Sequence, residues 1–273
     1  MTSKSILVFD FDGVISNSVH DSFRTALNTY IAFRPVHSLP VDRALGTAAE
    51  TYRFETDHPG LFDLFCKLIP LGSHAEDYYT IFTLLDRKAV HEVKSQGDFD
   101  AYRKAIPDGE QKAYHALFYE IRNALQKKDP KDWAGLMPVF PEVAEALPVL
   151  SERFILAIAT AKDLFSVNLQ LKEYGIERYF LPENILDKDF AKAKLDHLTL
   201  LRRRHGVPFE RIHFIDDKVL HLVSVAGLGV RCYLAVWGFN TRREHSLAKK
   251  HGFVLLKLEE LKDLGKMGEQ NAD

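Results

Sequence analysis

Two aspartates spaced two residues apart, Asp10 and Asp12, are the residues whose types and spacing most directly suggest chemistry. They follow an apolar run at positions 6–9 that is typical of a buried strand, and residues i and i+2 of a strand share a face. Gly13 then permits a turn. Two carboxylates held this close repel each other, so the arrangement costs stability unless a cation lies beside them or the pair takes part in a reaction. Taken alone, the stretch could also be a strand followed by an acidic turn.

Further polar residues stand at the ends of other expected elements. Thr160 follows an apolar run, Asp216 and Asp217 follow another, and Lys194 opens a helical pattern between them. In an open parallel sheet, ligands bind beyond the carboxyl ends of the strands. Each residue has an ordinary alternative, such as a helix N-cap for Thr160, a surface lysine for Lys194 and a loop for the acidic pair. Their common position at one edge of one sheet predicts a single polar site.

Strands alternate with helices after residue 138, which predicts an α/β core with a parallel sheet covered by helices on both faces. The strand at 5–9 has no partner nearby in sequence, so we expect it to join this later sheet. Helical patterns dominate from residue 18 to about residue 130, and their aromatic stripes are expected to pack helices together. The sequence therefore predicts a core formed by residues 1–17 and 138–273 and an inserted helical domain at 18–137. The strands are expected at 5–9, 154–159, 212–215, 230–236 and 253–256, and the core helices at 143–150, 165–174, 194–205, 219–226, 242–251 and 258–264.

The composition is that of an ordinary globular protein, with 273 residues, 46% of them hydrophobic and 27% charged. A formal net charge of -2 argues against a broad nucleic-acid interface, and the basic run 202–204 is expected to be a solvated helix face. No signal peptide or membrane span is visible, so we expect a cytoplasmic protein. Cys66 and Cys232 lie in apolar segments and are expected to be buried thiols of a reducing compartment.

The motifs, taken in order, resemble the haloacid dehalogenase (HAD) superfamily of aspartate-nucleophile phosphohydrolases. The resemblance covers residues 1–17 and about 138–273, and implies a Rossmann-like parallel sheet. The helical insertion stands where this family places a C1-type cap domain, and the phosphoglycolate phosphatase and β-phosphoglucomutase branch is the most similar. The matching motifs are Asp10-Phe11-Asp12-Gly13-Val14, the strand ending at Thr160, Lys194, and Asp216-Asp217.

The resemblance also implies roles for these residues. Asp10 would attack phosphorus and form an aspartyl-phosphate, and Asp12 would act as general acid and then general base. The Thr160 hydroxyl and the Ala161 amide would hold phosphoryl oxygens. Lys194 would neutralise the phosphate and position Asp10.

The resemblance further implies a Mg²⁺ cofactor, because this cation prefers oxygen ligands. Asp10, the backbone carbonyl of Asp12 and Asp217 would bind the metal, with Asp216 acting through water or from behind these ligands. His221 occupies a position where many relatives carry a further aspartate, and we interpret it as a helix-face histidine.

Lys192 is an alternative to Lys194 as the motif lysine. Lys194 is preferred because Leu198 and Leu201 then lie on the buried side of its helix, and because its spacing to Asp217 fits the family pattern.

The activity implied is Mg²⁺-dependent hydrolysis of a small phosphorylated metabolite by a monomer or homodimer, with no nucleic-acid or membrane partner. A phosphomutase acting on a sugar phosphate is an alternative that the core motifs do not separate. A dehalogenase is disfavoured because such relatives lack the acid at position 12. A non-catalytic binding protein on this scaffold is disfavoured because neither the nucleophile nor a metal carboxylate is lost.

Substrate choice is expected to depend on the insertion. Its candidate polar residues are His20, Arg24, Tyr52, Arg53 and Arg87, each of which could equally be a solvated helix residue. Hinges are expected near residues 16–18 and 135–138, where the chain passes between the two parts.

Overall fold

The computed structural model describes residues 4–72, 74–191 and 193–264, and the chain divides into two compact units. Unit 1 consists of Met1–Asn17 together with Pro138–Asp273, and unit 2 consists of Ser18–Met137.

Unit 1 is built on a parallel sheet whose strand order, within the described residues, is β3-β2-β1-β4-β5-β6. The expected joining of the N-terminal strand to the later sheet is confirmed, since Phe9 pairs with Ile158 of β2 and Ile215 of β4. A sheet of this order with helical crossovers is the α/β architecture that the sequence predicts. The strands are β1 (Ser5–Phe9), β2 (Phe154–Ala159), β3 (Ile185–Leu186), β4 (Ile212–Asp216), β5 (Arg231–Ala235) and β6 (Val254–Leu256).

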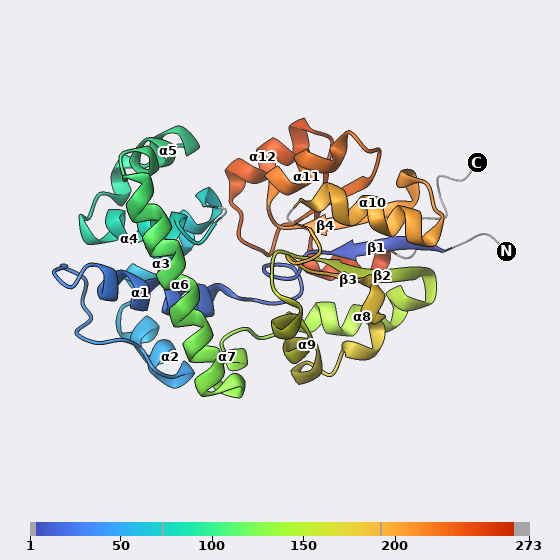
Figure 1. The fold of residues 1–273 in the computed structure, drawn as a ribbon. Coiled ribbons are helices and arrows are strands. Elements are labelled where there is room, and N and C mark those ends of the chain that lie inside the picture. Colours follow the sequence, from blue (N-terminus) through green and yellow to red (C-terminus); the bar gives the residue numbers. More distant parts are fainter. Residues whose placement is uncertain (1–3, 73, 192, 265–273) are drawn as a thin grey trace. The chain divides into compact units, whose positions relative to one another are not determined.

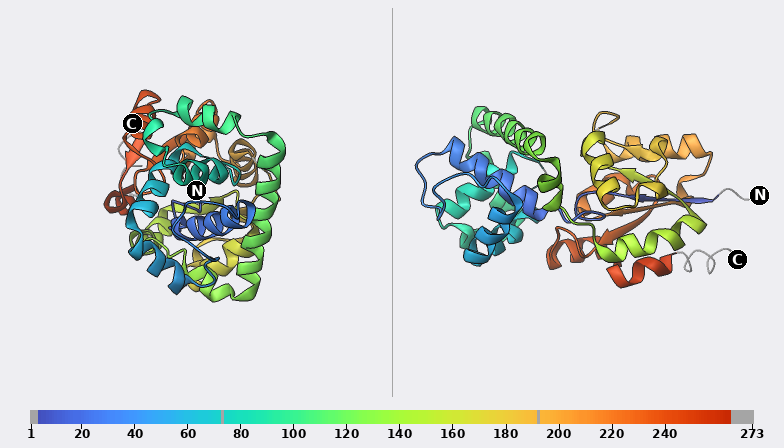
Figure 2. Two further views of the ribbon diagram at one scale, coloured as in Figure 1. Left: turned by 90° about the vertical axis from the view of Figure 1, so that its left-hand side faces the viewer. Right: turned by 90° about the horizontal axis from the view of Figure 1, so that it is seen from below.

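Helices cover both faces of this sheet (Figures 1 and 2). Leu7 and Phe9 pack into one apolar cluster with α8 (Pro141–Arg153), α9 (Leu164–Glu173) and the 3₁₀ helix Leu258–Asp263.

The alternate residues of β1 point to the opposite face of the sheet. Ile6 and Val8 pack there with α10 (Lys194–His205), α11 (Val219–Ala226) and α12 (Arg242–Lys250). Because side chains alternate along β1, a residue that continues the strand beyond Phe9 faces the helix layer that its position in this alternation assigns.

The sequence prediction missed one strand. Strand β3 has only two residues, Ile185 and Leu186, and pairs at the sheet edge with Ile158 and Ala159. Two residues are too few to show a period of two, so no pattern could have indicated this strand. Elsewhere the element boundaries differ by only a few residues, with α8 extending further at both ends than expected.

The regular secondary structure of unit 2, in the part that the structure describes, is helical. Aromatic rings fill its interior, with Phe82 lying 5.5 Å from Phe65 and 6.0 Å from Phe23 between ring centroids. The long helix α6 packs against α1 and runs along one side of the unit (Figure 2). The helices are α1 (Val19–Phe33), α2 (Ala48–Asp57), α3 (Pro59–Leu68), α4 (Asp77–Asp86), α5 (Gln96–Lys104), α6 (Asp108–Lys128) and α7 (Pro130–Gly135).

Three minor expectations can be checked on this fold. Arg202, Arg203 and Arg204 are exposed on α10, as predicted. Cys66 and Cys232 are both free thiols, but only Cys232 is fully buried. None of the helices in the described ranges combines the length and the apolar character needed to cross a membrane.

Candidate active site

Asp10 lies just beyond β1 and points toward the α10 layer, as the alternation from Val8 requires. Its Oδ1 accepts a hydrogen bond from Lys194 Nζ at 2.7 Å. The same ammonium donates to the Ala159 carbonyl at 2.6 Å and lies 3.3 Å from Asp216 Oδ2. The first residue of α10 therefore ties together the ends of β1, β2 and β4.

The electrostatics at this point are unbalanced. Burial raises the pKa of Asp10 to about 6, with Lys194 opposing that rise and Asp216 adding to it. Burial alone would lower the pKa of Lys194, but Asp10 and Asp216 outweigh it and raise the pKa above its usual value. One buried lysine thus serves two carboxylates, and burial still holds the pKa of Asp10 above its usual value.

Asp216 is surrounded by hydrogen-bond donors. Its Oδ1 accepts from the Lys218 amide at 2.8 Å, and both carboxylate oxygens lie 3.1 Å from His221 Nδ1. Burial raises the pKa of Asp216, but His221 and Lys194 outweigh it and lower the pKa to about 2. His221 is therefore more than a solvated helix-face residue, which is a correction to our interpretation of the sequence: its ring nitrogen pairs with a buried carboxylate.

Asp217 is enclosed by two glycines from distant parts of the chain. A Cβ built on Gly13 would lie 2.4 Å from Asp217 Oδ2, and one built on Gly238 would lie 2.3 Å from Asp217 Cβ. Gly13 also has a φ of +83°, which disfavours any other residue. The carboxylate accepts a hydrogen bond from the Phe239 amide at 2.7 Å. Burial raises the pKa of Asp217 to about 7, and Asp216 and Asp10 add to the rise.

Thr160 and Lys162 form the next part of the site, after β2. Thr160 is buried, and its Oγ1 accepts from the Lys162 amide at 3.1 Å, which leaves the hydroxyl proton available to donate. Ala161 is exposed between them. Lys162 Nζ donates to Asp12 Oδ1 at 2.6 Å. Asp10 and Asp12 thus have different lysine partners, Lys194 and Lys162 respectively.

The donor set fits a hard divalent cation. Asp10, Asp216 and Asp217 place buried carboxylate oxygens around the ends of β1 and β4, and oxygen donors of this kind suit Mg²⁺. Burial is the largest cause of the raised pKa values of Asp10 and Asp217, and a cation bound beside them would favour their charged forms. Ligand atoms of Asp10, Asp216 and His221 all lie within 4.8 Å of one another, but the Lys194 ammonium already bridges the two carboxylates. A cation is therefore better placed on the Asp217 side of Asp10.

The structure brings together Asp10, Asp216, Asp217, Lys194 and Thr160, with Asp12 alongside. Lys192, the alternative lysine, lies outside the described residues. The sequence analysis assigned no role to Lys162 or to the Gly238–Phe239 turn. A signal for Lys162 existed, because it stands two residues after Thr160 at the end of a strand. The turn carries no recognisable pattern.

The polar candidates in unit 2 are mostly engaged within that unit. Arg24 is completely buried and donates to Asp132 Oδ2 at 3.1 Å, so it is not a solvated helix residue. His20 Nδ1 lies 2.8 Å from Glu55 Oε2, and the Tyr52 hydroxyl donates to the Gly135 carbonyl. Arg53 and Arg87 are exposed.

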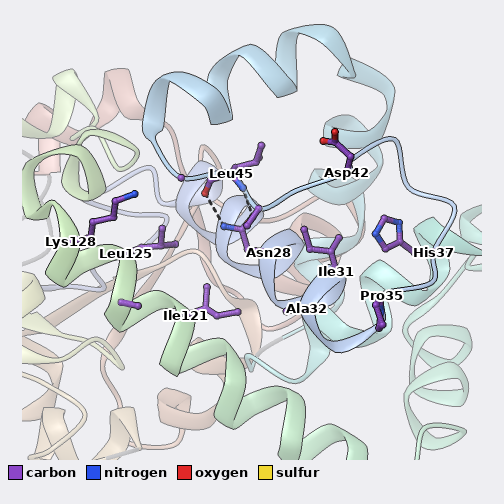
Figure 3. Close-up of a pocket in the computed structure, with 13 residues that line it drawn as sticks. Asn28, Ile31, Ala32, Pro35, His37, Asp42, Leu45, Ile121, Leu125 and Lys128 are labelled. Carbon is purple, nitrogen blue, oxygen red and sulfur yellow. Dashed lines mark hydrogen bonds between the residues drawn. The ribbon is translucent and has the colours of Figure 1, made fainter.

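Unit 2 also has a hollow of about 550 Å³ between α1, α6 and the segment that follows α1 (Figure 3). Its lining is mainly apolar, with Ile31, Ile121 and Leu125 among the contributors. Asn28 forms two hydrogen bonds with the Leu45 backbone, so its amide is already used. Among the described residues, this lining lacks the paired carboxylates of unit 1.

The fold and the clustered carboxylates define an α/β protein with an aspartate-rich edge of its parallel sheet. Residues 4–222 match the family model described as haloacid dehalogenase-like hydrolase, and the chain belongs to this family. The resemblance noted in the sequence is therefore confirmed.

Similar proteins agree with this assignment. Human magnesium-dependent phosphatase 1 is 29% identical over 104 residues, which are 37% of this chain and 57% of that protein. The crystal structure of a predicted phosphoglycolate phosphatase from Haemophilus somnus covers 98% of this chain and 100% of its own, with a TM-score of 0.58 and 18% identity. A HAD family hydrolase from Deinococcus radiodurans, solved with bound phosphate and sodium, covers 98% of both chains with a TM-score of 0.56 and 16% identity. At these identities the two structures establish the fold.

Proposed function

We propose that this protein is a Mg²⁺-dependent phosphatase that hydrolyses a small phosphate monoester through an aspartyl-phosphate on Asp10. The observation that carries the proposal is the buried Asp10 carboxylate, fixed by Lys194 at 2.7 Å beside two further buried aspartates. Such a group is oriented for attack and is surrounded by ligands for a cation.

The reaction divides into two displacements at phosphorus. In the first, an Asp10 oxygen forms a bond to phosphorus while the ester O–P bond breaks, and Asp12 gives its proton to the leaving oxygen. In the second, a water oxygen attacks phosphorus, Asp12 takes a proton from that water, and the bond between Asp10 and phosphorus breaks. Asp10 and protonated Asp12 are restored, and the products are the alcohol and inorganic phosphate.

The other residues bind and orient the phosphoryl group. The Thr160 hydroxyl has a proton to donate to a phosphoryl oxygen, and the Ala161 amide lies exposed beside it. Lys194 orients Asp10 and adds positive charge next to the transferred group.

Asp10, the Asp12 carbonyl and Asp217 would hold Mg²⁺, and Asp216 would support them through Lys194 and His221. When bound, the cation offsets negative charge on the phosphoryl oxygens and the carboxylates.

Two of the similar proteins support the chemistry. The human relative is described as a magnesium-dependent phosphatase, and the Deinococcus hydrolase contains bound phosphate. Because the human match covers only 57% of that protein, the substrate is proposed here from the site of this chain.

The organisation of the chain fits the same proposal. We infer that unit 1 is the catalytic core and unit 2 the cap that selects a small phosphorylated metabolite. The connecting segments run side by side, since the Asn17 amide donates to the Pro138 carbonyl and the Phe140 amide to the Ile15 carbonyl. We propose that the protein acts in the cytoplasm, where its two free cysteines would stay reduced, and that it works as a monomer or homodimer.

The test is release of inorganic phosphate from a panel of phosphorylated metabolites and from 4-nitrophenyl phosphate, with Mg²⁺ and with EDTA. We expect EDTA to abolish turnover, and Asp10→Asn to reduce kcat by about 10⁵-fold or more, as loss of a nucleophile does in other enzymes. Asp196→Asn, on the exposed side of α10, is the matched control and should retain full activity. Unchanged turnover in Asp10→Asn would overturn the mechanism. Conversion of a sugar phosphate to its isomer without phosphate release would identify a mutase instead.

A further inference from the structure

Lys162 places a buried positive charge directly against the proposed general acid. Its side chain is 3% exposed, whereas that of Asp12 is 35% exposed. Lys162 Nζ donates to Asp12 Oδ1 at 2.6 Å and lies 5.3 Å from the centre of the Phe11 ring. Removing an ammonium group from water is costly unless it is paired, so the contact with Asp12 helps to hold this lysine inside unit 1.

The backbone around Lys162 is held on both sides. Its amide donates to Thr160 Oγ1, and its carbonyl accepts from the Lys188 amide at 3.4 Å. The next residue, Asp163, caps α9 by accepting from the Ser166 amide at 2.9 Å. Lys162 is therefore a fixed reference point, and Asp12 is the more exposed member of the pair.

We propose that Lys162 is a positioning residue for Asp12. It binds Oδ1, so that Oδ2 is the oxygen that gives a proton to the leaving group and takes one from water. This inference rests on the proposed phosphatase function and assigns to Lys162 a role in proton transfer alone.

A different role would make Lys162 a ligand of the phosphoryl group. The two roles predict different kinetics. A phosphate ligand affects every phosphate ester alike, and it weakens competitive inhibition by inorganic phosphate. A residue that positions the general acid matters only where the leaving oxygen needs a proton.

The experiment compares two substrates by kcat/KM, which reports the steps up to formation of the aspartyl-phosphate. An alkyl phosphate leaves as an alcohol and needs protonation, whereas 4-nitrophenyl phosphate leaves as a stabilised phenolate and does not. For Lys162→Met we expect a loss on the order of 100-fold with the alkyl phosphate, and of less than about 3-fold with the aryl phosphate. Inhibition by inorganic phosphate should be unchanged.

Two further variants complete the design. Lys162→Arg keeps a cation beside Asp12 and should restore most of the alkyl phosphate activity, while Lys172→Met, on the exposed face of α9, should match the wild type. Should Lys162→Met not fold, Lys162→Gln carries the same comparison. Equal losses with both substrates, or no loss with either, would overturn the role of Lys162. Absence of phosphate release by the wild-type protein would instead overturn the proposed function.

Discussion

Both units bury charged side chains, but they arrange them differently. In unit 1 several buried charges converge on one edge of the sheet, where Asp10, Asp216 and Asp217 lie close to Lys194. In unit 2 they pair one helix with another, as in the contact of Arg24 in α1 with Asp132 in α7. In both arrangements, favourable contacts must offset the free energy lost when charges are removed from water.

The difference distinguishes charges that connect helices from charges that form a candidate reaction site. A paired charge in unit 2 connects helices, and Asp132 also accepts from the Ala48 amide at the start of α2. The carboxylates of unit 1 exceed the nearby lysines, and burial keeps the pKa of Asp10 at about 6 and that of Asp217 at about 7. A cluster of buried carboxylates with raised pKa values marks a candidate functional site, because perturbed pKa values gather at such sites.

The largest expected effect tests whether the cluster of Asp10, Asp216, Asp217 and Lys194 in unit 1 is needed for catalysis. Lys194→Ala removes the cation shared by Asp10 and Asp216. We expect kcat/KM for phosphate esters to fall by about 10³-fold or more, because orientation and charge at the nucleophile are lost together. Steady-state kinetics measures this, with thermal unfolding as a check that the variant is folded.

The exposed Lys172 on α9 offers the matched control for that experiment. Lys172→Ala should leave kcat/KM within about 2-fold of the wild type, since surface substitutions away from a site have small effects. Retention of activity in Lys194→Ala would break the comparison, because the buried charges of unit 1 would then be architectural too.

The next effect tests the opposite assignment for unit 2. Phe82 is fully buried and lies within 6.0 Å of the rings of Phe23, Tyr30 and Phe65. Phe82→Ala should lower the free energy of unfolding by about 3 to 4 kcal/mol, the usual cost of a large cavity. Urea denaturation measures the loss.

A half-buried ring of the same cluster, Phe62, supplies the comparison. Phe62→Ala should cost less, about 1 to 2 kcal/mol, because part of its surface already faces water. Equal losses for the two variants would contradict a close-packed aromatic interior in unit 2.

An intermediate effect concerns pH. His213 in β4 is buried beside Tyr233, and burial, assisted by Arg231, lowers its pKa from 6.5 to about 4. Between these pH values the unfolded chain binds a proton that the folded protein excludes. The neutral His213 side chain contributes fully to the free energy of unfolding above pH 6.5. This contribution is lost as the pH falls toward 4, and the total loss is about 2 to 3 kcal/mol.

Urea denaturation across this pH range measures the slope. His213→Gln removes the titrating group, so the difference between wild type and variant should change by about 2 to 3 kcal/mol between pH 7 and 4. His251→Gln, at an exposed position after α12, should show no such change. A constant difference between His213→Gln and the wild type would disprove the assignment.

The smallest expected effect concerns the apolar hollow of unit 2. Ala124 is exposed on α6 and lines the apolar hollow of unit 2. Ala124→Leu adds apolar volume to an open space, so the free energy of unfolding should change by no more than about 0.5 kcal/mol. Turnover of 4-nitrophenyl phosphate should stay at the wild-type level. A loss of more than 10-fold would show that the hollow of unit 2 takes part in substrate binding or catalysis.

The sequence predicted the parts of the fold that rest on repetition. Strand β2 and helices α10 and α11 have the predicted bounds, because several apolar residues recur there at the period of their element. Strand β3 was missed because two residues cannot show a period.

The residues of the site likewise fall into those that a local sequence pattern predicts and those that it does not. Asp10 and Lys194 were predictable because each stands at the boundary of a regular element, and the structure joins them at 2.7 Å. The contacts of Lys162 with Asp12 and of His221 with Asp216 depend on how loops bring side chains together, and no local pattern records that. The partners of Arg24 were hidden for the same reason, since Asp132 lies far along the chain.

The central strand β1 is also the first part of the sheet to leave the ribosome. Its two neighbours, β2 and β4, begin at Phe154 and Ile212, after the whole of unit 2 has been made. At roughly 5–20 residues per second, synthesis of that insertion takes on the order of 10 seconds, far longer than helices need to form. Unit 2 has time to fold while the apolar segment of β1 waits without partners. Asp10 and Asp12, which follow β1, are thus synthesised well before the residues that surround them in the folded protein.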